Sequence, residues 1–91
     1  MNNLRSIKKD ISFFIGDFID DCMLFAMFHE DKALDQVEAL INEAVELGDE
    51  LYAKVNHPEE GANLKAWYKQ IGKDLLGGLD ELCQKLSALA K

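Results

Sequence analysis

Apolar side chains recur every three or four residues along the first third of the chain, from about Asn3 to Phe28. This spacing places them on one face of an α-helix. The predicted core stripe consists of Leu4, Ile7, Ile11, Phe14, Phe18, Cys22 and Phe25, widened by Ile15 and Ile19. A polar turn, His29-Glu30-Asp31, follows the stripe, and Asp31 is the expected N-cap of the next helix.

Two further segments repeat the helical pattern. The second helix is predicted from about Lys32 to Val55, with a coiled-coil-like seam made of Leu34, Val37, Ile41, Ala44, Gly48, Leu51 and Val55. The third follows the turn Asn56-His57-Pro58 and starts either at Pro58 or after Asn63 as N-cap. Its core positions are Leu64, Tyr68, Ile71, Leu75, Leu79, Leu82, Leu86 and Leu89.

Short turns between long helices make sequence neighbours antiparallel. The pattern therefore predicts an all-α, up-down-up three-helix bundle that forms a single domain over residues 1–91. A single proline and the predominance of Leu, Ala, Glu and Lys agree with this fold class. The third helix breaks its spacing between Leu75 and Leu79, where Gly77 and Gly78 predict a kink or hinge.

The end of the first helix departs from the amphipathic pattern. The run from Cys22 to Phe28 is apolar on every side, so a three-helix bundle cannot cover all of it. The side chains predicted to form an exposed interaction surface are Phe13, Met23, Leu24, Met27 and Phe28. The alternative is that the helix ends early and the run folds over the end of the bundle.

This surface favours a non-enzymatic protein–protein interaction module, either a homodimer or a chain that docks another protein. A second hypothesis is a small apolar ligand bound between the helices near Gly77-Gly78, with Trp67 as a possible lining residue. No nucleophile has a neighbouring base, and the two histidines fall in turns at opposite ends of the bundle. We therefore expect no catalytic residue, no cofactor and no metal, and Asp17, Asp20 and Asp21 are interpreted as a solvated face.

The chain is acidic, with a formal net charge of −7. Residues 10–62 hold fourteen acidic side chains against two lysines, which disfavours nucleic acid and anionic membranes as partners. The longest apolar run, Cys22 to Phe28, is far too short to span a membrane, and the amino-terminal residues do not resemble a secretion signal. We expect a cytoplasmic protein, with Cys22 and Cys83 as buried free thiols.

One basic stripe stands out against this acidic background. Lys65, Lys69 and Lys73 recur every four residues along the third helix. If the chain reverses near residue 57, they lie level with Glu50, Glu46 and Glu43 on the second helix. The pattern therefore predicts weak charge pairing between the second and third helices rather than a nucleic-acid site.

Overall fold

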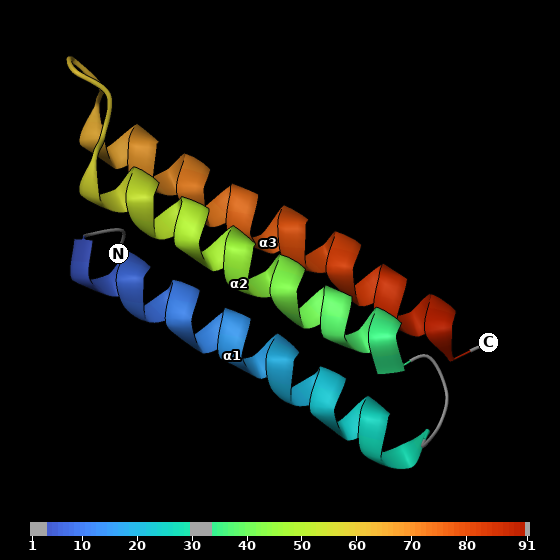
Figure 1. Ribbon diagram of the computed structural model, residues 1–91. Coiled ribbons are helices and arrows are strands. Elements are labelled where there is room, and N and C mark those ends of the chain that lie inside the picture. The colour runs from blue at the N-terminus through green and yellow to red at the C-terminus, as the bar shows by residue number, and fades with distance from the viewer. Residues whose placement is uncertain (1–3, 30–33, 91) are drawn as a thin grey trace.

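The computed structural model describes residues 4–29 and 34–90 as three long helices that pack side by side (Figure 1). The helices are α1 (Leu4–Phe28), α2 (Leu34–Asn56) and α3 (Leu64–Leu89). They run up, down and up, so α1 and α3 are parallel and α2 is antiparallel to both. All three helices pack against one another in a body of 50 × 17 × 17 Å. The predicted all-α three-helix bundle is confirmed.

The start of α3 is fixed by a side-chain cap. Oδ1 of Asn63 accepts a hydrogen bond from the backbone N–H of Ala66 at 3.1 Å, which satisfies one of the free N–H groups at the helix start. The residues before the cap form a turn, in which Gly61 has a φ of +81°. Of the two predicted starts, Asn63 is correct. The predicted N-cap of α2, Asp31, lies outside the described residues.

The core is a continuous apolar layer between the helices. Its buried side chains are Ile7, Ile11, Ile15, Phe18, Cys22, Val37, Leu40, Ala44, Leu51, Val55, Ile71, Leu75, Leu79 and Leu82. None of the described polar or charged side chains is buried. A layer of this kind stabilises the fold by about 1.5–3 kcal/mol for each large side chain removed from water.

Several predicted core positions lie further out than the periodicity indicates. Leu34 and Leu64 are about half exposed because each is the first residue of its helix, at an end of the bundle. Ile41 is only half-buried, and Leu40 on the neighbouring helix position is buried. Phe14 is 37% exposed and lies at the edge of the core. The side chain of Leu4 lies outside the described part of the chain.

Two glycines allow close contact between helices. A methyl group at Gly48 would lie 3.5 Å from Cγ1 of Ile15, and one at Gly78 would lie 2.8 Å from Cδ2 of Leu47. The second distance is too short for two carbon atoms, so the absence of a side chain at Gly78 lets Leu47 reach the α3 backbone. α3 is helical without interruption through Gly77 and Gly78, and the hinge stays a prediction.

Candidate interaction surface

The last turn and a half of α1 carries four exposed apolar side chains, which we call the apolar tip. They are Met23 (57% exposed), Leu24 (49%), Met27 (68%) and Phe28 (79%). Because α1 continues to Phe28, the alternative in which the helix ends early is wrong. The run is therefore presented as a helical surface at the end of the bundle where α1 is followed by α2 (Figure 1).

The inward side of the same turns is occupied by other residues. Cys22 is fully buried, and Phe25 and Ala26 pack against the core while remaining half-buried. The ring of His29 stacks on the ring of Phe25 at a centroid distance of 4.3 Å. At about 100° per residue, these inward positions leave the side chains of the tip pointing outward or to the flanks.

Phe13 is exposed as well, but it lies away from the tip. It precedes Met23 by ten residues, which corresponds to about 15 Å along the helix axis. Exposed Asp17 and Asp20 lie between them. The ring of Phe13 is 67% exposed and contacts Phe14 edge to face, with centroids 5.3 Å apart. The structure therefore brings four of the five predicted surface residues together and separates the fifth.

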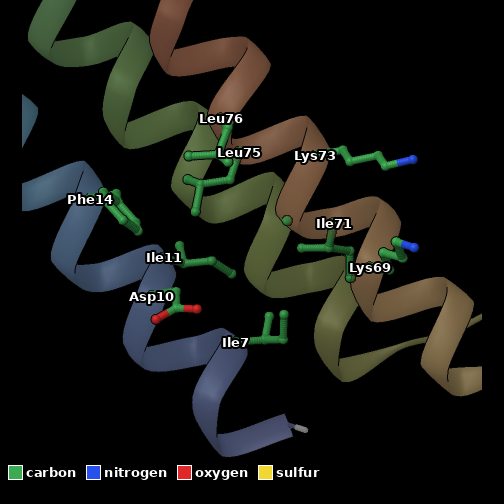
Figure 2. Close-up of a pocket in the computed structure, with 10 residues that line it drawn as sticks. Ile7, Asp10, Ile11, Phe14, Lys69, Ile71, Lys73, Leu75 and Leu76 are labelled. Carbon is green, nitrogen blue, oxygen red and sulfur yellow. The ribbon is translucent and has the colours of Figure 1, made fainter. Parts of the chain in front are cut away.

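A second apolar feature, missed by the sequence analysis, is a groove between α1 and α3 (Figure 2). It has a volume of about 320 Å³. Its lining residues are Ile7, Asp10, Ile11 and Phe14 from α1, and Lys69, Ile71, Gly72, Lys73, Leu75 and Leu76 from α3. The signal in the sequence was Leu76, a large apolar residue outside the predicted core stripe, 59% exposed in the structure.

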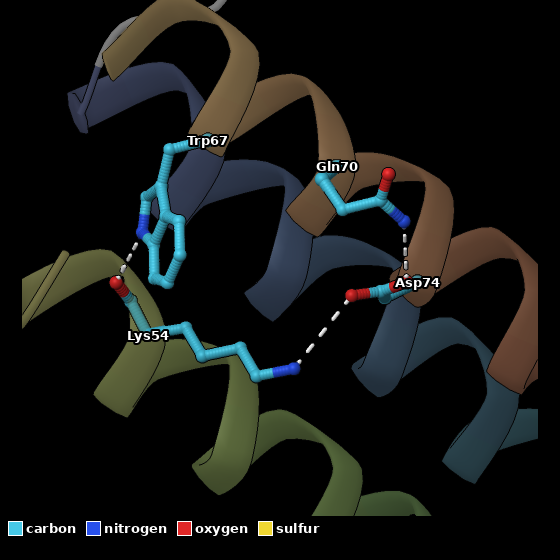
Figure 3. A network of polar contacts seen from close by, with 4 residues as sticks. All are labelled: Lys54, Trp67, Gln70 and Asp74. Carbon is cyan, nitrogen blue, oxygen red and sulfur yellow. Dashed lines mark hydrogen bonds and ion pairs between the residues drawn. The ribbon is translucent and has the colours of Figure 1, made fainter. Parts of the chain in front are cut away.

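The other flank of α3, which faces α2, is closed by polar contacts (Figure 3). The indole N–H of Trp67 donates to the backbone carbonyl of Lys54 at 2.7 Å. Nζ of Lys54 lies 3.7 Å from Oδ2 of Asp74. Oδ1 of the same carboxylate accepts a hydrogen bond from Nε2 of Gln70 at 2.9 Å. One turn from the end of α3, Nζ of Lys85 lies 2.9 Å from Oε1 of Glu43.

These contacts correct the predicted charge register between α2 and α3. Glu43 pairs with Lys85, and no described ion pair involves Lys65, Lys69 or Lys73. The predicted register is wrong: Glu43 was expected level with Lys73 but lies beside Lys85, because the turn before α3 extends to Asn63 rather than reversing the chain near residue 57. Lys69 and Lys73 lie on the flank of α3 that borders the groove toward α1.

Neither Gly77 nor Gly78, where a ligand site was predicted, lines the groove or the small cavity beside Trp67. Leu47 fills the space at Gly78. The small cavity has a volume of about 190 Å³ and is bordered by charged Lys54, Glu59 and Asp74. Trp67 itself is half-buried between α2 and α3.

Both cysteines have raised pKa values. Cys22 is buried, and burial together with the nearby charge of Asp21 raises its pKa to about 11. Cys83 was predicted to be buried and is exposed, so that prediction is wrong. Its pKa is also raised, through partial desolvation and neighbouring carboxylates. In the described residues, no three His, Cys, Asp or Glu side chains are grouped so as to hold a metal ion.

Comparison with known proteins does not add a function. The chain matches no protein family model, no curated protein and no solved structure. Within the described part of the chain, no helix has the length and apolar character needed to cross a membrane.

Proposed function

We propose that this protein is a non-enzymatic interaction module that self-associates through the apolar tip of α1. The observation that carries the proposal is the exposure of Met23, Leu24, Met27 and Phe28 on adjacent turns. Full burial of such side chains is worth about 1.5–3 kcal/mol each. Exposed methionine and leucine side chains also adapt to the shape of a partner.

A second copy is the partner that the charge pattern favours. The segment from Cys22 to Phe28 contains no charged residue, so two tips can meet without placing like charges in direct contact. Leu34, which is 49% exposed, begins α2 at the same end of the bundle and enlarges the apolar area. If a two-fold axis passes through this end of the bundle, the same side chains of both copies form the interface, as in most homodimers.

The expected dimer is weak. A stable interface of standard size buries about 800 Å² on each partner, whereas the whole chain exposes 6361 Å² and the tip is one end of an elongated body. Association also costs about 4–15 kcal/mol in lost translational and rotational freedom. The small apolar gain is therefore largely offset, which predicts a dimer that forms at micromolar or higher concentration.

The salt dependence of association distinguishes a second copy from a basic protein as the partner. Each chain carries a net charge of −7, so two copies repel one another and salt should strengthen their association by screening. A basic protein bound through the acidic surface would show the opposite dependence. We expect the dimer fraction to rise between low and high sodium chloride.

The test is sedimentation velocity of the wild type and of Met27→Asp over a range of concentrations. We expect the wild type to dimerise and Met27→Asp to remain monomeric, because the substitution places a charge in the centre of the tip. Phe13→Asp is the matched control, since Phe13 and Met27 are 67% and 68% exposed and only Met27 belongs to the tip. A wild type that stays monomeric at all concentrations, or an equal loss in both variants, would contradict the proposal.

A further inference from the structure

We propose that the groove between α1 and α3 binds a medium-chain alkyl carboxylate, with its chain on the apolar floor and its head group near Lys69 and Lys73. This site lies in the amino-terminal halves of the two helices, away from the apolar tip (Figure 2). The proposal is independent of self-association, because none of the tip residues lines the groove.

The floor of the groove is made of core side chains. Ile7, Ile11, Ile71 and Leu75 line it and are each at most 3% exposed. Above them, Phe14 on α1 and Leu76 on α3 form the two walls, and both are partly exposed. A volume of about 320 Å³ is at the lower end of the range for small-molecule sites, which is about 300–1,000 Å³.

Gly72 keeps this space open. A methyl group at Gly72 would meet no atom within 4 Å, so the glycine is not required by a neighbouring helix. Glycine in the middle of a helix is nevertheless the least favourable residue after proline. A larger side chain at this position would project into the groove that Gly72 lines. The lack of a side chain at Gly72 therefore leaves room for a ligand rather than for another part of the protein.

The charges around the groove favour an anionic head group. Lys69 and Lys73 lie on its α3 side, and neither is paired with a described acidic side chain. Figure 2 shows both ammonium groups directed away from α1, beyond α3, so each exposed side chain would have to swing back over α3 to place its charge at the α3 edge of the groove. Long lysine stems can lie along apolar surface while the charge reaches a neighbour in water. Asp10 on the α1 side would repel an anion, so we place the head group at the α3 lip.

The length of the groove limits the alkyl chain. Along α1 the lining residues extend from Ile7 to Phe14, seven residues, or about 10 Å. This distance fits a chain of medium length and is too short for a docked helix of several turns. Each methylene that enters the groove should tighten binding by up to about fourfold, the equivalent of its transfer from water.

The experiment is isothermal titration calorimetry with sodium decanoate, performed below its micellar concentration. Decan-1-ol and decyltrimethylammonium bromide test the contribution of charge, and Gly72→Leu tests the groove. Gly77→Leu is the matched control, because Gly77 is on the same helix, also has no atom within 4 Å, and does not line the groove. Circular dichroism on each variant checks that the helices are retained.

We expect decanoate to bind the wild type and Gly77→Leu equally, and Gly72→Leu to lose binding at least tenfold. Lys69→Gln combined with Lys73→Gln should weaken decanoate several-fold and leave decan-1-ol unchanged. Met27→Asp should bind decanoate as the wild type does, which keeps this test separate from that of the dimer. Equal binding by Gly72→Leu, or a preference for the cationic amphiphile, would overturn the proposal, as would a groove covered by a second copy in solution.

Discussion

The two flanks of α3 differ in how completely they are packed. Toward α2 the flank is closed by Leu47 over Gly78, by the Trp67 indole bonded to Lys54, and by the Lys85–Glu43 pair. Toward α1 the same helix borders an apolar groove of about 320 Å³, lined in part by Lys69 and Lys73, neither of which takes part in a described ion pair. One helix thus combines a closely packed flank with a flank that leaves apolar surface exposed.

The glycines of α3 show the same difference on a smaller scale. At Gly78 a side chain would collide with Leu47, so glycine is needed for close packing between helices. At Gly72 a side chain would meet nothing, so glycine leaves an opening. The same residue type therefore serves packing on one flank and access on the other.

The largest loss of stability is expected when a side chain is added on the flank of α3 that faces α2. Gly78→Leu forces Leu47 and its helix outward, and overpacking of this kind costs about 1–3 kcal/mol. Gly77→Leu faces open space and should lose no stability, because leucine is about 0.8 kcal/mol more favourable than glycine in a helix. Urea denaturation of both variants measures the difference. Equal urea midpoints for the two variants would show that Leu47 can move aside without loss of stability, and that the α2 flank is not closely packed at Gly78.

A smaller loss of stability is expected when a polar contact on that flank is removed. Trp67→Phe removes the hydrogen bond to the carbonyl of Lys54, in the last turn of α2 where no intrahelical partner is available. We expect a loss of about 1 kcal/mol in the free energy of unfolding. Leu76→Gln, on the open flank, should change stability by no more than about 0.5 kcal/mol, because this side chain is 59% exposed. A larger loss at Leu76 than at Trp67 would reverse the comparison.

The smallest effect is expected for the surface charges. Lys85→Ala breaks the pair with Glu43, but both side chains are about half exposed, so the loss should be at most about 1 kcal/mol. The loss should disappear in high salt, whereas Lys73→Ala should have no effect at either ionic strength. Thermal denaturation at two salt concentrations checks both variants. A salt-dependent loss at Lys73 would indicate a partner for this lysine within the bundle.

The helices and their order were predictable because apolar spacing reports directly on the buried face. Ile11, Leu51, Ile71 and Leu75 were placed in the core from periodicity alone, and all are buried. The exposure of Met27 followed from the same geometry, since a helix that is apolar all round cannot be covered by two neighbours.

The relative rotation of the helices was not predictable from one chain. Lys69 and Lys73 were expected beside Glu46 and Glu43 on α2, but they line the groove toward α1, and Glu43 pairs with Lys85 instead. Cys83 was predicted to be buried and is exposed, because it lies about 100° around α3 from the buried Leu82. The groove depends on this rotation and on Gly72, whose contribution is the absence of a side chain.

The two cysteines give the folded chain a built-in reporter of motion. Cys83 is exposed, while Cys22 is fully covered and has a pKa of about 11, so very little of it is thiolate near neutral pH. An alkylating reagent should therefore modify Cys83 first and reach Cys22 only when α1 lifts from its neighbours. The rate of that second modification measures how often the half of α1 that carries the apolar tip opens, and slower labelling at higher protein concentration would show that association holds it in place.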